Sequence, residues 1–217
     1  MLSFLKKFRK AYLTRLLRIY YSQFGEDVVV RELIGKKKEG IYVDVGCYHP
    51  IKFSNTYWLY RRGWRGVNVD MEEHKIELFK VARSKDHNVL AAVSDLSQKL
   101  YVKNIKRNDL GAHLESEGSE SEAIVTRSLN EILSESPYAQ RKIDLLSIDA
   151  ESHDFNVLKS IDLSIYQPDY ILIEAHGNDI RKFLDSEINR YLESYKYRLR
   201  SWVVSTMIFT NSLTLTR

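Results

Sequence analysis

Short apolar runs alternate with amphipathic segments along most of this chain. The runs that predict buried strands are residues 41–45, 66–69, 89–93, 143–148 and 170–173. The segments that predict helices are residues 55–62, 71–83, 128–133 and 180–195. Because strands and helices alternate, the order predicts a doubly wound, mostly parallel, Rossmann-like α/β sheet. Residues 199–204 and 207–210 predict an antiparallel pair of strands at its C-terminal edge.

The first twenty residues form a separate pattern. Apolar side chains recur there at helical spacing, and six basic residues precede the first acidic residue, Glu26. This spacing predicts a basic amphipathic helix over residues 1–20, followed by a single folded domain over residues 21–217. Two interpretations of the helix stay open: docking on an anionic membrane surface or a membrane-bound partner, or packing on its own domain with the charges in water. Residues 104–122 are polar and predict a mobile loop or lid.

Charge and cysteine content restrict the class of protein. The formal net charge is +4, and without the six N-terminal basic residues the remainder carries −2. This imbalance argues against a nucleic-acid enzyme, whose basic surface normally surrounds the catalytic cleft. Cys47 is the single cysteine, so no intramolecular disulfide can form. We expect a cytoplasmic protein, with peripheral contact at the inner face of the membrane if the N-terminal helix docks there.

Aspartates end three of the predicted strands, where an open α/β sheet binds its ligands. They are Asp44, Asp70 and Asp149, and Gly46 follows the first of them in a predicted tight turn. The glycine pattern that binds a pyrophosphate is absent, which disfavours a dinucleotide. An adenosine without phosphate, attached to a cationic sulfonium, fits an acidic site better. Each aspartate alone is equally consistent with a helix cap.

Four motifs in order carry a family resemblance. They are SQFGED at 22–27, IYVDVGCYHPIKFSNTYWLYRRGWRGVNVD at 41–70, AAVSD at 91–95 and DLLSIDAESHDFNVLK at 144–159. With them the chain resembles the FkbM family of methyltransferases from about residue 21 to residue 213. The resemblance implies a class I methyltransferase fold, S-adenosylmethionine as the methyl donor, and a hydroxyl of a sugar or glycan-like molecule as the acceptor. The family's usual Asp-Val-Glu-Gly reads Asp149-Ala150-Glu151-Ser152 here, and the following acid, commonly Glu, is Asp154.

The resemblance also implies a set of cofactor-binding residues. Asp44 and Gly46 are expected beside the methionine half of the cofactor, Asp70 beside the ribose and Ser94 near the adenine. Gln23, Ser54 and Asn55 resemble further contributors to the same pocket. For Gln23 and Ser54, a role as a turn or helix cap is an equal alternative.

The chemistry of methyl transfer to an alcohol suggests candidates for catalysis. The hydroxyl must lose its proton as it reacts, and His153, four residues after Asp149, is the candidate base because imidazole titrates near neutral pH. Asp149, Glu174 and His176 form another candidate group, which could ligate a divalent cation that holds the hydroxyl.

The expected reaction is therefore methylation of a sugar hydroxyl, in a surface glycan, its nucleotide-linked precursor or a glycosylated metabolite. Two alternatives stay open. One is an O-methyltransferase for a polyketide or phenolic hydroxyl, which would need an apolar, closed acceptor cleft. The other is a scaffold protein of glycan synthesis that keeps the methyltransferase fold without turnover.

Overall fold

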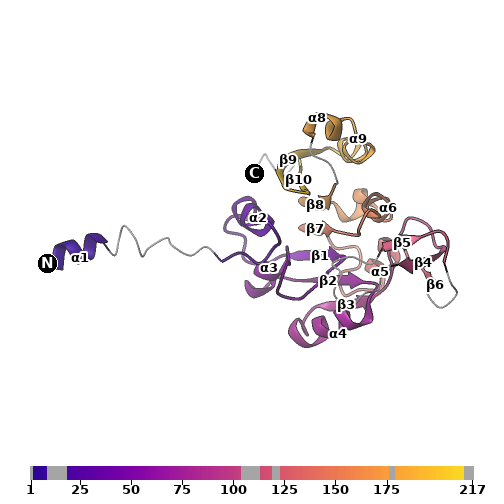
Figure 1. Cartoon of the computed structure of the whole chain (residues 1–217), viewed down its shortest axis with the longest axis horizontal. Helices are drawn as coiled ribbons and strands as arrows, with labels where there is room; N and C mark the ends of the chain where they lie inside the picture. Colours follow the sequence, from indigo (N-terminus) through magenta and orange to yellow (C-terminus); the bar gives the residue numbers. More distant parts are fainter. Residues whose placement is uncertain (1, 9–18, 104–112, 119–122, 176–178, 213–217) are drawn as a thin grey trace.

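The computed structural model describes residues 2–8, 19–103, 113–118, 123–175 and 179–212. Seven strands form the main sheet, and their spatial order differs from their order in the chain (Figure 1). In spatial order they are β3 (His87–Leu90), β2 (Arg65–Asp70), β1 (Ile41–Val45), β7 (Leu145–Ile148), β8 (Tyr170–Glu174), β10 (Thr206–Asn211) and β9 (Tyr197–Val203). The first five are parallel, while β10 runs antiparallel to both β8 and β9. The predicted fold class, including the antiparallel C-terminal edge, is confirmed.

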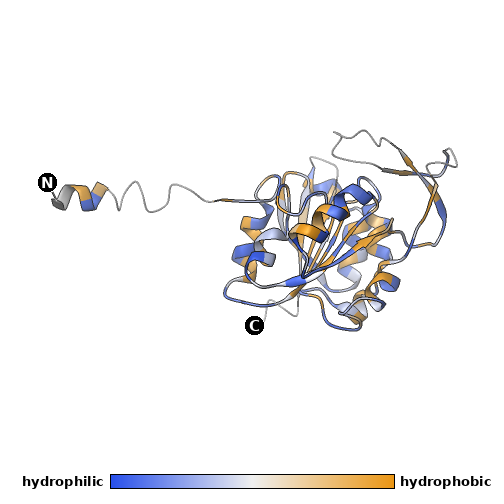
Figure 2. Cartoon of the chain, turned by 90° about the horizontal axis from the view of Figure 1, so that it is seen from below, coloured by the Kyte–Doolittle hydropathy of each residue, from blue (hydrophilic) through white to orange (hydrophobic). Residues whose placement is uncertain are grey.

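Alternate residues of each strand point to opposite faces of this sheet, and helices pack against both faces. In β1, Tyr42 packs into one apolar cluster and Val43 into another. The Tyr42 cluster includes residues of helices α2 (Glu26–Ile34) and α3 (Tyr57–Arg61). The Val43 cluster includes residues of α5 (Leu129–Ser134), α6 (Asp154–Lys159), α7 (Leu163–Tyr166), α8 (Ile180–Leu184) and α9 (Glu187–Ser194). Figure 2 shows the apolar strands enclosed between these helices.

Most predicted elements are present with shifted ends. The first strand matches residues 41–45, and α5 begins at the predicted place, where Ser128 caps it in a capping box with Glu131. The predicted helix over 71–83 is α4 (Glu73–Ala82), which packs on β2 and β3. The single helix predicted over 180–195 is wrong, because the chain turns after α8 and Ser186 caps a new helix, α9.

A second, three-stranded antiparallel sheet was not expected from the sequence. Its strands, in spatial order, are β5 (His113–Glu115), β4 (Lys99–Lys103) and β6 (Ala123–Val125). Two of them are three residues long, which is too short for a recognisable alternation of apolar and polar residues. The prediction of a loop over 104–122 is therefore wrong at residues 113–115. Residues 104–112 and 119–122 lie outside the described residues.

The structure describes only part of the segment predicted as an N-terminal helix. Helix α1 covers Leu2–Phe8, whereas residues 9–18 lie outside the described residues. Ile19 and Tyr20 are not helical, so the helix does not extend to residue 20 as predicted. Within the parts of the chain that the structure describes, no helix combines the length and the apolar character needed to cross a membrane.

Candidate functional site

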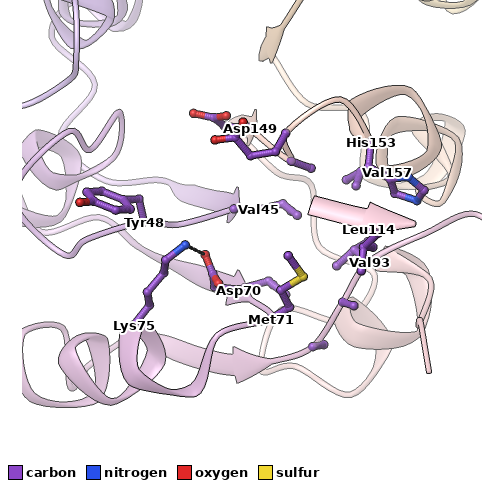
Figure 3. A pocket seen from close by; sticks show the side chains of 16 residues that line it. Val45, Tyr48, Asp70, Met71, Lys75, Val93, Leu114, Asp149, His153 and Val157 are labelled. Atoms are coloured by element: carbon purple, nitrogen blue, oxygen red, sulfur yellow. Dashed lines mark hydrogen bonds and ion pairs between the residues drawn. The ribbon is translucent and has the colours of Figure 1, made fainter. Parts of the chain in front are cut away.

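A hollow of about 600 Å³, partly open to solvent, lies at the carboxyl ends of β1, β2 and β7 (Figure 3). We call it the donor hollow. The turn after β1 forms its floor, where Gly46 has a φ of 77°. A Cβ atom on Gly46 would lie 1.7 Å from the carbonyl oxygen of Asp149. Only glycine therefore allows the turns after β1 and β7 to approach this closely.

Asp70, the last residue of β2, brings a buried carboxylate to the donor hollow. Its Oδ1 accepts the backbone N–H of Glu72 at 2.8 Å, and its Oδ2 lies 3.4 Å from Nζ of Lys75. Burial raises the pKa of Asp70, and the positive charge of Lys75 opposes this rise. Lys75 also pairs with Glu72 at 2.5 Å. The sequence did not single out Lys75, although its position in the first turn of the helix after β2 was a usable signal.

The opposite wall of the donor hollow is largely apolar. Ala91, Ala92 and Val93 follow β3, and Val157 comes from α6. Leu114, from β5 of the small sheet, contributes to the same wall. In Figure 3, Val93, Leu114 and Val157 lie together, while Tyr48, Asp70 and Lys75 lie on the other side. The hollow therefore has one charged wall and one wall suited to a flat apolar group.

His153 belongs to the apolar wall. Its Nε2 lies 2.9 Å from the hydroxyl of Ser94, which is fully buried behind the wall. Burial lowers the pKa of His153, so its imidazole is neutral at pH 7. The neighbouring Asp95 holds α6 in place through Lys159 at 2.6 Å and Asn156 at 2.9 Å. Burial opposes ionisation of Asp95, but these two partners outweigh it, and its pKa falls to about 2.

Asp149 stands at the end of β7, on the side of the donor hollow that faces β8. It stays open to solvent along one side, and a hydrogen bond links its carboxyl group to Glu174 at the end of β8. Crowding by protein atoms, followed by the negative charge of Glu174, raises the pKa of Asp149 above the usual range of a carboxyl group. A carboxyl pair of this kind holds a proton near neutral pH and can exchange it.

The predicted cation site at Asp149, Glu174 and His176 is not supported. Within the described ranges, no group of three or more His, Cys, Asp or Glu side chains is placed to hold a metal ion. His176 lies outside the described residues. Asp149 and Glu174 do lie together, as predicted, but as a hydrogen-bonded pair.

The turn after β7 keeps a glycine-like conformation without a glycine. Ser152 has a φ of 73° and Glu151 a φ of 49°, both in the left-handed region that L-residues avoid. Asp154 stabilises the turn by accepting the backbone N–H of Ala150 at 2.9 Å. The substitution of the family's glycine by Ser152 therefore leaves the left-handed turn in place and introduces local strain.

Other predicted site residues lie beneath the donor hollow. Asp44 and Ser54 are buried around the fully buried guanidinium of Arg83. Arg83 donates to Ser54 at 2.6 Å and to Thr56 at 2.7 Å, and Thr56 in turn donates to Asp44 at 2.5 Å. Burial raises the pKa of Asp44, while Arg83 opposes the rise. The sequence did not identify Arg83 as the residue that ties the loop after β1 to the sheet.

Asn55 and Gln23 complete the set of predicted residues. Nδ2 of Asn55 donates to Ser147 of β7 at 3.2 Å, and Gln23 is exposed in the turn before α2. Neither residue lines the donor hollow, nor do Asp44, Ser54 and Ser94. Of the predicted residues, the structure thus brings Gly46, Asp70, Asp149 and His153 to the hollow itself.

The strand order and the ligand-binding edge together define the class I methyltransferase type of fold. Residues 44–199 match the family model described as the methyltransferase FkbM domain. Because the match spans well over half of the chain, this protein belongs to the FkbM family of S-adenosylmethionine-dependent methyltransferases. Among curated proteins, none matches the chain.

Two solved structures are among those similar to this chain. One is a TehB-like S-adenosylmethionine-dependent methyltransferase from Corynebacterium glutamicum, with 14% identity, 97% of each chain covered and a TM-score of 0.46. The other is a precorrin-8w decarboxylase from Methanobacterium thermoautotrophicum, with 14% identity, 89% of this chain and 88% of that chain covered and a TM-score of 0.43. Neither likeness bears on the acceptor or on the residues of the site.

Proposed function

We propose that this protein is an O-methyltransferase that methylates a sugar hydroxyl of a glycan or of a glycosylated metabolite. The observation that carries the proposal is the donor hollow, where the carboxylate of Asp70 faces an apolar wall across the Gly46 turn. This combination suits an adenosine that carries no phosphate: Asp70 can accept two hydrogen bonds from the ribose diol, and the apolar wall can cover the adenine. His153 and Leu114 then contact the adenine end.

The opposite end of the donor hollow suits the methionine part of the donor. Gly46 allows close approach to the backbone, and the Asp149–Glu174 pair, which shares one proton, supplies one negative charge near a cationic sulfur. When bound, S-adenosylmethionine would supply the methyl group that the acceptor oxygen takes. The electrons of the broken sulfur–carbon bond would remain on the sulfur. The acceptor hydroxyl must also release its proton. The ionised member of the Asp149–Glu174 pair is the group that we propose receives it.

The location of the protein is part of the same proposal. Cytoplasmic methylation, with residues 1–20 held at the inner face of the membrane, is supported by the charge of this segment. Its six basic residues have no acidic neighbour before Glu26, and Leu5 and Phe8 of α1 are exposed. Basic segments with exposed apolar side chains bind anionic lipid surfaces through both contributions.

Two measurements on the full chain test the reaction. Calorimetry with S-adenosylhomocysteine and with NAD tests the donor site, and we expect heat of binding only with the former. Mass spectrometry then follows incubation of the protein and S-adenosylmethionine with separate panels of glycans, nucleotide sugars and phenols. A mass gain of one methyl group on a sugar supports the proposal. Methylation of phenols alone, or of nitrogen in an amino sugar, would overturn the assignment to a sugar hydroxyl.

A further inference from the structure

A second hollow, of about 1090 Å³ and partly open to solvent, lies between α6, α8, α9 and the ends of β8, β9 and β10. We call it the outer hollow. Of the residues that line it, the sequence pointed only to Glu174, as a candidate metal ligand. The space within the outer hollow that water molecules can occupy, about 520 Å³, lies within the range of small-molecule sites.

The outer hollow adjoins the donor hollow through a single turn. Asp149, Ala150 and Glu151 of the turn after β7 line the donor hollow. Ser152, within the same turn, lines the outer hollow. The hydrogen bond between Asp149 and Glu174 crosses the boundary between the two hollows, since Asp149 lines the donor hollow and Glu174 lines the outer one. A molecule in the outer hollow would therefore meet the carboxyl pair from the side opposite the donor.

Aromatic side chains form one wall of the outer hollow. Phe183 and Trp202 lie with their ring centroids 5.8 Å apart, and Phe155 of α6 also lines the hollow. The indole N–H of Trp202 donates to the carbonyl of Val204 at 2.6 Å, which fixes the ring. Rigid aromatic faces of this kind pack against the apolar C–H faces of sugar rings, and they do so with little loss of conformational freedom.

The polar groups of the outer hollow are mainly acceptors. Its described lining carries three carboxyl side chains, from Asp154, Glu174 and Asp179, against one exposed cation, Lys182. Carboxylates accept hydrogen bonds from vicinal hydroxyl groups, but they repel phosphates. Sites for phosphates normally present arginine or several donors, and no arginine lines the part of this hollow that the structure describes.

We infer that the outer hollow binds the methyl acceptor, and that this acceptor is an uncharged sugar rather than a nucleotide-linked one. The inference rests on the proposed function and narrows it to one class of acceptor. The sugar ring packs on Trp202 and Phe183, and its hydroxyl groups donate to Asp179 and Glu174. One hydroxyl then lies at the Asp149–Glu174 pair, which receives its proton when the oxygen gains the methyl group.

Saturation-transfer NMR on the full chain, saturated with S-adenosylhomocysteine, tests the inference. The probes are methyl glycosides of neutral hexoses and, for comparison, UDP-glucose. We expect transfer to at least one methyl glycoside and weaker or no transfer to UDP-glucose. Trp202→Ala should abolish the glycoside signal, whereas Trp202→Phe, which keeps a ring, should retain it. Asp179→Asn should weaken glycoside binding roughly tenfold by removing a charged acceptor.

Two controls separate failure of the inference from failure of the proposed function. Trp58 lies in the cluster on the other face of the sheet, so Trp58→Ala should leave glycoside binding unchanged. Binding of S-adenosylhomocysteine should change less than about twofold in every variant, since none of the substituted residues lines the donor hollow. If Trp202→Ala also loses binding of S-adenosylhomocysteine, its loss of glycoside binding does not distinguish a local effect from misfolding. The Asp179→Asn variant then tests the inference, because asparagine preserves the cap of α8.

The outcomes that overturn the inference are specific. They are preference for UDP-glucose, unchanged glycoside binding in both the Trp202→Ala and the Asp179→Asn variants, or no transfer to any glycoside by a protein that binds S-adenosylhomocysteine. Failure of the unsubstituted protein to bind S-adenosylhomocysteine would instead overturn the proposed function.

Discussion

Nε2 of His153 lies 2.9 Å from the hydroxyl oxygen of Ser94, a contact that joins the start of α6 to the segment after β3. The contact places the imidazole on the apolar wall of the donor hollow, whereas the Asp149–Glu174 pair lies at the boundary with the outer hollow. A histidine in this position is better placed to hold the adenine end of the donor than to deprotonate an acceptor.

The first prediction concerns the role of His153. His153→Ala should weaken binding of S-adenosylhomocysteine several-fold and lower kcat less than tenfold, because the proton acceptor remains in place. Calorimetry and steady-state kinetics measure the two effects separately. Loss of a general base would lower kcat by roughly 10²–10⁴-fold. A drop of that size with unchanged binding would restore His153 as the base, the role that the sequence suggested.

The second prediction concerns the carboxylate of Asp70. Asp70→Asn keeps the shape of the side chain but removes its charge, so charged hydrogen bonds to the ribose worth about 1.5–3 kcal/mol are lost. The dissociation constant for S-adenosylhomocysteine should rise by about one to two decades. Asp169→Asn is the matched control, because Asp169 is a buried carboxylate that pairs with Lys142 and does not line the donor hollow. Equal affinity in Asp70→Asn and the unsubstituted protein would show that Asp70 is structural.

The third prediction concerns pH and the Lys75–Asp70 ion pair. Ribose binding requires ionised Asp70, so affinity should fall as pH decreases through the raised pKa of Asp70. Lys75→Met removes the nearby positive charge, which raises the pKa of Asp70 further and moves the loss of affinity to higher pH. Titration of S-adenosylhomocysteine binding from about pH 5 to pH 8 measures this shift. Lys75→Arg keeps the positive charge, so its affinity should depend on pH as that of the unsubstituted protein does. The same pH dependence in the Lys75→Met and Lys75→Arg variants would contradict the prediction.

The fourth prediction concerns strain in the turn after β7. Ser152→Gly should raise the free energy of unfolding by up to about 1 kcal/mol, because glycine adopts the φ of 73° without the left-handed penalty. Urea denaturation measures the change. Ser134→Gly, in the last turn of α5, is the matched control and should destabilise the protein by about 0.5–1 kcal/mol. Destabilisation by both substitutions would mean that Ser152 makes a compensating contact.

The fifth prediction concerns the basic N-terminal segment. Removal of residues 1–20 should leave binding of S-adenosylhomocysteine unchanged, because none of those that the structure describes, residues 2–8, 19 and 20, lines the donor hollow. It should weaken association with anionic phosphatidylserine vesicles, measured by sedimentation, and the difference should shrink at high salt. Neutral phosphatidylcholine vesicles serve as the control. Equal sedimentation of both proteins with the anionic vesicles would rule out membrane docking by this segment.

Much of the fold and part of the site follow from local sequence patterns. The apolar runs determine the parallel strands, because each run must be buried on both faces of a helix-covered sheet. Gly46, Asp70 and Asp149 could be placed near one another from sequence, since the carboxyl ends of parallel strands meet at one edge. The short strands of the small sheet and the break between α8 and α9 could not, because a few residues carry too little periodicity.

Tertiary structure decided which of these side chains reach a hollow and what they meet there. Asp44 shares the side of β1 that bears Tyr42, so it is buried with Arg83 instead of lining the donor hollow. Leu114 joins the apolar wall only because the small sheet packs beside it. Trp202 and Phe155 lie far apart in the chain and form one hollow only once β9 is paired with β10 at the sheet edge. Sequence spacing determines contacts within an element, whereas contacts between elements depend on the packing of the whole chain.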